Sequence, residues 1–352
     1  MRPKIFVSVS VLGWDTELPT TVLSCLQNRS GDNDITIGIA FVGNLGEWDE
    51  ARQDILVFED PEASKMVKME RFQLKDNWGV AKGRNLAASL YNGEDYFFQV
   101  DAHTYFVKDW DKILVKKYEE ATRITKNKRT VLTAIPLEYV HPGGGKNEMY
   151  LAEKNIGYPA FSEGIWWIDG VIPGWQHVDP CGMYSRTLKI MATQTGFAPS
   201  PKTCAAFMFG SKELAENITL PDNLVFWEEE IVQSIELLSL GFSFVYPLLV
   251  GPIYHMYGEW TTPTHGARFN VGELFSMYED LGDRLRGLDT AKGNPVQDLG
   301  RINFNKYYEE NFDKVAAYEK YARVSLKSAI VHGKYPDGYA NIGFDPVEGG
   351  TK

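Results

Sequence analysis

The chain has 352 residues, of which 44% are hydrophobic and 24% charged, a composition typical of globular proteins that excludes disordered and collagen-like classes. The formal net charge of −11 argues against broad binding to a nucleic-acid backbone, which depends on clustered Lys and Arg. No stretch of the sequence approaches the roughly 18 uninterrupted apolar residues that a membrane span needs.

Cysteine usage and the first residues indicate where the protein works. Cys25, Cys181 and Cys204 are far apart and lack C-x-x-C spacing, so neither a disulfide framework nor a thiolate zinc site is indicated. The opening MRPKIFVSVSVLGWD lacks the leucine-rich segment and the cleavage site of a signal peptide. We therefore expect a cytoplasmic protein.

The first half of the chain alternates short apolar runs with helix-like segments, which predicts a mainly parallel sheet covered by helices. The expected strands are 5–11, 35–42, 67–74, 95–100 and 130–135, and the expected helices are 18–27, 79–91 and 109–125. Asp15 and Thr16 are capping candidates for the first helix. The acidic segment 48–64 is expected to be a surface connection.

The second half begins with an irregular segment, 136–180, that is rich in Gly, Pro, Tyr and Trp. Regular patterns return with a strand at 204–209, a helix at 228–240 and a strand at 242–246. From about residue 266 the pattern is mostly helical. We therefore expect an α/β domain over 1–265, with 136–180 as an irregular insertion, and a mostly helical C-terminal extension packed on it over 266–352.

The tripeptide Asp101-Ala102-His103 directly follows the strand expected at 95–100. The carboxyl ends of strands are where open α/β sheets bind ligands. Residues i and i+2 of a strand point the same way, so if the strand geometry continues, the carboxylate and the imidazole converge on one ion. A mixed oxygen and nitrogen pair suits Mn²⁺ or Mg²⁺ better than a thiolate-seeking metal. The alternative is that Asp101 caps a turn and His103 is a packed histidine.

Several segments resemble a known family over nearly the whole chain. They are IFVSVS with DTELPTTVLSCL, GVAKGRNLAASLYNGEDYFFQVDAHTYFVKDWD, CAAFMFGSKEL, FWEEEIVQSIELLSLGFSFVYP and IYHMY. The sequence is similar to the cytoplasmic hydroxyproline N-acetylglucosaminyltransferases and, more distantly, to the polypeptide N-acetylgalactosaminyltransferases. The resemblance implies a GT-A-type nucleotide-sugar-binding fold with an Asp-x-His variant of the Asp-x-Asp motif.

The resemblance also implies further site residues. His255 in IYHMY stands where the family has a third metal ligand, and its alternative is a buried histidine. Arg84 stands near the donor nucleotide, with Asn85 and Asp101 as further donor-binding candidates. An Arg suits phosphate or uracil through its planar fork of donors. The alternative for Arg84 is a solvated helix charge.

Three consecutive glutamates open the helix expected at 228–240. The family pattern is an aromatic residue, Gly, then Glu-Glu-Ile, and here Glu228 replaces the Gly. We expect Glu229 first and Glu230 second to face donor-sugar hydroxyls or the acceptor. A helix-dipole role explains all three carboxylates without catalysis.

Two segments without regular pattern carry candidates for contact with the substrates. Trp166, Trp167 and Trp175 lie in the insertion, which is predicted to be on the acceptor side. There they either stack on a sugar or acceptor, or pack in the hydrophobic core. The loop after IYHMY, which includes Arg268, is expected to close over the diphosphate or to be a plain connector.

The implied reaction moves a sugar, N-acetylglucosamine in the resembling family, from a UDP-sugar to a protein hydroxyproline or Ser/Thr hydroxyl. Mn²⁺, or Mg²⁺, stabilises the leaving diphosphate, and the resemblance implies retention by front-face attack without a dedicated base. Two alternatives stay open: transfer to a glycan or a hydroxymethylated DNA base, and a catalytically silent nucleotide-sugar-binding domain. The expected partners are a nucleotide-sugar donor and a hydroxyl acceptor; nucleic acid is disfavoured, and no membrane is expected.

Overall fold

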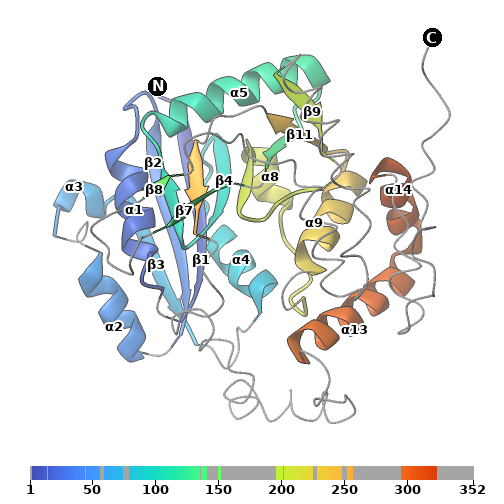
Figure 1. Ribbon diagram of the computed structural model, residues 1–352, viewed down its shortest axis with the longest axis horizontal. Coiled ribbons are helices and arrows are strands. Elements are labelled where there is room, and N and C mark those ends of the chain that lie inside the picture. Colours follow the sequence, from blue (N-terminus) through green and yellow to red (C-terminus); the bar gives the residue numbers. More distant parts are fainter. Residues whose placement is uncertain are drawn as a thin grey trace.

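The computed structural model describes most of the α/β region and two helices near the end of the chain. The described residues are 2–13, 15–43, 45–55, 59–73, 79–134, 136–140, 150–151, 196–200, 202–224, 228–247, 252–256 and 295–322. Within them, helices cover both faces of a central sheet (Figure 1). The expected α/β class with a mainly parallel sheet is confirmed.

The central sheet has eight strands in the described part of the chain. In spatial order they are β3 (Val67–Phe72), β2 (Asp34–Val42), β1 (Lys4–Leu12), β4 (Tyr96–Asp101), β10 (Phe207–Ser211), β6 (Thr130–Thr133), β11 (Ser243–Pro247) and β9 (Phe197–Pro199). The first four strands in this order, β3, β2, β1 and β4, are parallel to one another, and β6 is parallel to β11. β10 is antiparallel to both of its neighbours, and β9 is antiparallel to β11.

The strand order reverses between β1 and β4. The chain proceeds outward from β1 to β2 and β3, and then returns to place β4 on the other side of β1. At such a reversal the connections leave the two strands in opposite directions, so a crevice forms outside their carboxyl ends. This edge of the sheet is therefore the expected place for a ligand.

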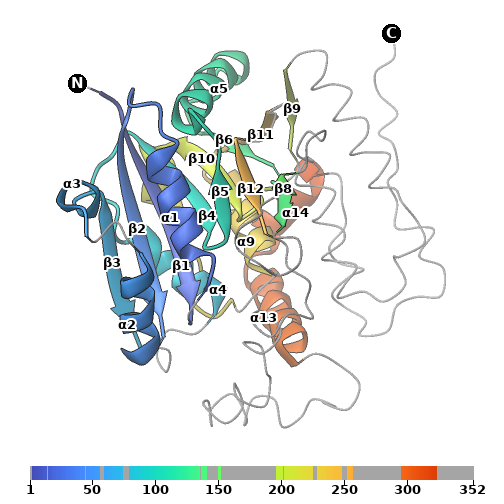
Figure 2. The same ribbon diagram turned by 60° about the vertical axis from the view of Figure 1, so that its left-hand side comes forward.

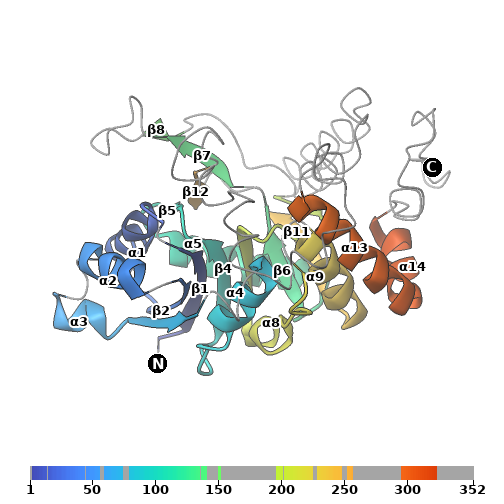
Figure 3. The same cartoon turned by 90° about the horizontal axis from the view of Figure 1, so that it is seen from below.

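Alternate residues of the central strands enter two separate cores. Val7 and Phe98 pack with helices α1 (Leu18–Gln27) and α5 (Trp110–Thr125) on one face of the sheet. On the other face, Phe6 packs with residues of α4 (Val80–Ala88), α8 (Lys212–Asn217) and α9 (Glu228–Ser239). Figure 3 shows α1 and α4 on opposite sides of β1. Burial on both faces explains why these strands read as continuous apolar runs.

A second, four-stranded sheet was not predicted from the sequence. Its order is β5 (Thr104–Phe106), β12 (Ile253–His255), β7 (Leu137–Val140) and β8 (Tyr150–Leu151). β12 is antiparallel to β5 and parallel to β7, and Figure 2 shows β5 and β12 side by side. The beginning of the segment expected to be irregular therefore contains two short strands, which form because pairing across the sheet outweighs the weak local pattern.

The expectation for residues 48–64 is wrong, because this segment is not a plain connection. It contains most of α2 (Leu45–Asp54) and the single turn α3 (Pro61–Ser64). Ala51 is fully buried in the core and Trp48 packs against it, so α2 is anchored by few apolar side chains. Among many acidic residues, so few apolar positions leave little helical periodicity to detect.

One expected strand is shifted along the chain. The run from Cys204 begins with a turn, in which the amide of Phe207 donates to the carbonyl oxygen of Cys204 at 3.0 Å, and β10 starts only at Phe207. The other strands and helices expected in the sheet region overlap elements of the structure.

Two helices near the end of the chain, α13 (Pro295–Glu310) and α14 (Phe312–Ala322), share a hydrophobic core with α9. The hydroxyl of Tyr307 on α13 donates to Glu236 of α9 at 2.7 Å. Figure 1 shows both helices beside α9. The helical pattern expected after residue 266 is confirmed over these two helices, whereas the domain boundary at 265 stays a prediction.

Candidate metal centre

Asp101 is the last residue of β4, and Ala102 and His103 form the bend between β4 and β5, so the strand geometry does not continue through the motif. The hydroxyl of Thr21 on α1 donates to the carbonyl oxygen of Ala102 at 2.6 Å and accepts from the amide of Thr104 at 2.8 Å. The hydroxyl of Thr104 donates to the carbonyl oxygen of Asp101 at 2.9 Å. These bonds satisfy backbone groups that the bend removes from strand pairing, and they fix its shape.

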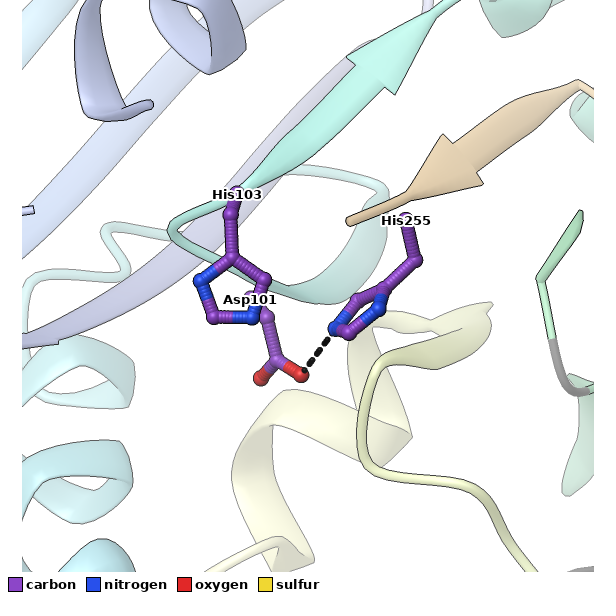
Figure 4. Close-up of side chains that lie close together, drawn as sticks. All are labelled: Asp101, His103 and His255. Atoms are coloured by element: carbon purple, nitrogen blue, oxygen red, sulfur yellow. Dashed lines mark hydrogen bonds and ion pairs between the residues drawn. The ribbon is translucent and has the colours of Figure 1, made fainter. Parts of the chain in front are cut away.

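The bend still brings Asp101 and His103 together, and the small sheet adds His255. An oxygen of Asp101 and one ring nitrogen of each histidine lie within 4.8 Å of one another. Figure 4 shows the three side chains converging. His255 ends β12 opposite Thr104 of β5, and the amide of Met256 donates to the carbonyl oxygen of His103 at 3.0 Å. Strand pairing thus joins residues 154 positions apart.

The carboxylate of Asp101 has a partner on each oxygen. Oδ1 accepts from Nη2 of Arg84 at 3.0 Å, and Oδ2 lies 3.1 Å from Nε2 of His255. Burial by itself raises the pKa of Asp101, but the charge of Arg84 and the hydrogen bond from His255 outweigh it and hold the pKa well below its ordinary value. Asp101 is therefore ionised, which is the state that binds a metal.

The imidazole of His103 is held by Asp15, which follows β1. Nδ1 of His103 lies 3.0 Å from Oδ2 of Asp15. Burial by itself lowers the pKa of His103, but the hydrogen bond and charge of Asp15, with the charge of Asp101, raise it overall. Figure 4 shows one ring nitrogen of His103 directed toward Asp101 and His255; because Nδ1 contacts Asp15, this nitrogen is Nε2.

Arg84 lies on α4 behind the cluster and is only 9% exposed, so its interpretation as a solvated helix charge is wrong. Besides Asp101, its guanidinium donates through Nη1 to the carbonyl oxygen of Ala205 at 2.8 Å. Its Nε lies 3.0 Å from Oε1 of Glu229 as an ion pair that lacks hydrogen-bond alignment. One buried cation thus contacts two carboxyl groups, those of the partly buried Asp101 and the buried Glu229.

Glu229 stands in the first turn of α9 and is 2% exposed. Its Oε2 has no hydrogen-bond partner within the described residues. Burial, together with the charges of Glu230, Asp101 and Glu228, raises the pKa of Glu229 to about 8, although Arg84 opposes this shift. Arg84 does not reverse this rise in the pKa of Glu229, because its charge is shared with Asp101 and its Nε is poorly aligned with Glu229.

The raised pKa of Glu229 predicts a specific dependence of stability on pH. Between the ordinary glutamate pKa, about 4.3, and about 8, the folded state keeps a proton that the unfolded state has released, so stability falls as pH rises. Glu229→Gln removes this titration. Thermal melts at about pH 5 and about pH 8 should therefore show a larger drop in Tm for the parent than for Glu229→Gln. Parallel drops would show that Glu229 is ionised throughout.

The structure places two other candidates in contacts with the protein itself. Glu230 accepts from the amide of Ala205 at 2.8 Å through Oε1, and its Oε2 pairs with the buried Lys202. Asn85 exchanges hydrogen bonds of 2.8 and 2.9 Å with the backbone of Leu220. Both side chains connect neighbouring segments, and their contact with a substrate stays a prediction.

Several expectations fall on residues that the structure does not describe. Trp166, Trp167, Trp175 and Arg268 all lie outside the described residues. Conversely, sequence reasoning missed the contacts of Asp15 and Thr21 with the motif. Asp15 was predicted only as a helix cap, and nothing in the sequence pattern distinguishes Thr21 from its neighbours on α1.

Ionisable side chains converging at the carboxyl edge of a mainly parallel sheet, beside the reversal of its strand order, are typical of an α/β enzyme. Comparison with known families supplies the chemistry. The model of a family described as Glycosyltransferase (GlcNAc) matches residues 5–267, and the chain belongs to this family.

Among solved structures, one similar chain is described as "Crystal structure of GalNAc-T7 with UDP, GalNAc and Mn2+". The two chains are 16% identical with a TM-score of 0.48, and the match covers 91% of this chain and 58% of the other. The chain thus spans somewhat more than half the length of that structure. A search of curated protein sequences found no match to the present chain.

Proposed function

We propose that the protein transfers a sugar from a UDP-sugar to an acceptor hydroxyl, and that Asp101, His103 and His255 hold a Mn²⁺ ion for this reaction. The observation that carries the proposal is the convergence of these three side chains at the carboxyl edge of the sheet. Membership of the glycosyltransferase family supports sugar transfer, and the family's description favours N-acetylglucosamine. We also infer that the fold is of the GT-A type.

The donor set suits the proposed ion. One ionised carboxylate and two imidazoles favour Mn²⁺ over Mg²⁺, because Mg²⁺ prefers oxygen ligands throughout. Asp101, His103 and His255 would hold the ion, and further coordination positions would remain for the diphosphate and water. When bound, the ion supplies positive charge beside the leaving diphosphate.

The protein's own side chains have separate tasks in this proposal. Arg84 keeps Asp101 ionised, while Glu229 contacts hydroxyls of the donor sugar through Oε2, the oxygen without a hydrogen-bond partner in the described part of the chain. We place Glu229 before Glu230 in this role, because both oxygens of Glu230 are engaged. We further propose retention by front-face attack, in which the leaving phosphate accepts the proton of the acceptor hydroxyl, so that no separate base is needed.

We infer a protein hydroxyproline, or a Ser/Thr hydroxyl, as the acceptor. Transfer to a hydroxymethylated DNA base is opposed by the net charge of −11. We place the protein in the cytoplasm, supported by the separate, buried thiols of Cys25 and Cys204. Of the helices in the described segments, none has the length and hydrophobicity to cross a membrane.

The test is a transfer assay with the full chain. UDP release from UDP-GlcNAc, UDP-GalNAc and UDP-glucose is measured with Mn²⁺, with Mg²⁺ and with EDTA. Each donor is tested with peptides that contain hydroxyproline, Ser/Thr or, as the matched control, proline. We expect Mn²⁺-dependent release that the hydroxyproline peptide raises and the proline peptide does not. Binding of a donor without any turnover would instead support a silent binding domain, and stimulation only by a glycan or modified DNA would move the acceptor to that class.

His255→Ala should weaken Mn²⁺ binding without abolishing it, because Asp101 and His103 remain. The side chain stands at the end of a short strand and is 7% exposed, so its loss should leave the central sheet intact. Titration of Mn²⁺ by electron paramagnetic resonance measures the affinity. His255→Ala with parental affinity would remove this residue from the ligand set.

A further inference from the structure

We propose that Asp15 is a positioning residue that fixes the tautomer and the orientation of His103, so that Nε2 of this histidine carries no proton and can coordinate the metal. The inference rests on the proposed metal site, but it concerns a residue that lies on a different segment from all three ligands. Its basis is the contact between Oδ2 of Asp15 and Nδ1 of His103 at 3.0 Å.

The position of Asp15 is itself fixed by the entry into α1. Its Oδ1 accepts from the amide of Glu17 at 2.9 Å, and its carbonyl oxygen accepts from the amide of Leu18 at 3.1 Å. Glu17 in turn accepts from the hydroxyl of Tyr139 on β7 at 3.2 Å. Asp15 is therefore held directly by the start of α1 and, through Glu17, by the small sheet. It is only 7% exposed.

A carboxylate held in this way determines where the histidine carries its proton. When Asp15 is ionised, its Oδ2 is an acceptor only, so Nδ1 of His103 must donate to it. In the neutral ring Nε2 is then the nitrogen without a proton. Figure 4 shows the second ring nitrogen directed toward Asp101 and His255. Metal-binding histidines usually donate their other N–H to such a partner, and loss of the partner typically costs 10–100-fold in metal affinity.

The decisive variant is Asp15→Asn. Asparagine can still accept from the amide of Glu17, so the turn into α1 is preserved, but its amide group can donate to Nδ1 and thereby favour a proton on Nε2. The proton on Nε2 would then prevent His103 from coordinating the metal, although the histidine itself is still present. Asp15→Ser is the second variant, because a serine also accepts at a helix start but is too short to reach His103.

The first measurement needs no metal. Long-range proton–nitrogen spectra of protein with ¹⁵N-labelled histidine, recorded at about pH 9 so that the rings are neutral, report the tautomer of each ring. The chain has only six histidines, and His103→Ala assigns the signal. We expect the proton of His103 on Nδ1 in the parent and a shift toward Nε2 in Asp15→Asn.

The second measurement is Mn²⁺ affinity by electron paramagnetic resonance. Both Asp15 variants should bind roughly 10–100-fold more weakly than the parent. The matched control is Asp111→Asn, which alters a fully buried carboxylate that accepts from Ser30 and Asn33. We expect Asp111→Asn to keep the parental Mn²⁺ affinity and the parental His103 tautomer, even if its Tm falls. A loss of affinity as large as that of the Asp15 variants would contradict an effect specific to Asp15.

The outcomes separate this inference from the proposed function. If the parent binds Mn²⁺ and the Asp15 variants keep both its affinity and its His103 tautomer, the positioning role is wrong while the metal site stands. If the parent binds no Mn²⁺, the metal site itself is wrong and the inference falls with it. If Asp15→Asn does not fold, Asp15→Ser decides by the same two measurements.

Discussion

Replacement of Asp101 by asparagine is expected to abolish Mn²⁺-dependent turnover and to reduce Mn²⁺ affinity by more than the roughly 10–100-fold that loss of a ligand's hydrogen-bond partner costs. The substitution removes the only carboxylate among the three convergent side chains of the described structure. Asparagine keeps the size of the side chain, and its oxygen can still accept from Arg84. The fold should therefore survive.

The control for Asp101→Asn is its effect on folding, followed by circular dichroism and thermal melting. His103→Ala is expected to give the same loss of turnover, since it removes a second member of the cluster. Turnover equal to that of the parent in either variant would remove the central claim. A collapse of folding in both would instead support the alternative in which Asp101 and His103 are structural.

Replacement of Arg84 by alanine is expected to destabilise the protein by about 3–5 kcal/mol, because it leaves the ionised carboxylate of Asp101 without its cation and the carbonyl oxygen of Ala205 without its donor. Arg84 contacts Asp101 and Glu229 at 3.0 Å each, and its side chain is 10% exposed. Arg84→Lys keeps the charge but cannot make the same fork of contacts, so its loss of stability should be intermediate. Urea denaturation measures the free energy of unfolding.

The matched control lies on the same helix. Lys82 pairs with Asp222 at 2.5 Å, but the two side chains are 28% and 56% exposed, so Lys82→Ala should change stability by only about 0–1 kcal/mol. Equal effects of Arg84→Ala and Lys82→Ala on the free energy of unfolding would contradict the stabilising role given to the buried guanidinium of Arg84. The predicted contact between Arg84 and the donor is tested separately, by donor affinity in the Arg84→Lys variant.

The sequence predicts the central sheet well because its strands are strongly apolar and its helices are amphipathic. Residues 97–100 are buried, and the charged Asp101 that follows them marks the carboxyl end of the strand in the sequence. The small sheet could not be predicted in this way. β5 and β12 have three residues each, too few for alternation to show, and they become strands through long-range pairing, β5 with β12 and β12 also with β7.

In the candidate site, too, residues in a local motif could be predicted from the sequence, whereas contacts that depend on long-range pairing could not. Asp101 and His103 follow from the motif, but for a different local reason from the one expected, since a bend held by Thr21 replaces the continuing strand. His255 could be proposed only through family resemblance, because the contact depends on long-range pairing. No sequence pattern indicates that Asp15 reaches His103, since a helix cap and a partner of a histidine look alike in one sequence.

The central claim is tested most directly by a crystal structure of the protein with UDP and Mn²⁺, using anomalous scattering to locate the ion. We expect one manganese peak at roughly 2.0–2.4 Å from an oxygen of Asp101 and a ring nitrogen each of His103 and His255, by analogy with other divalent sites. The diphosphate of UDP should complete its coordination. A manganese peak away from these three side chains, or UDP bound with none at this site, would contradict the account.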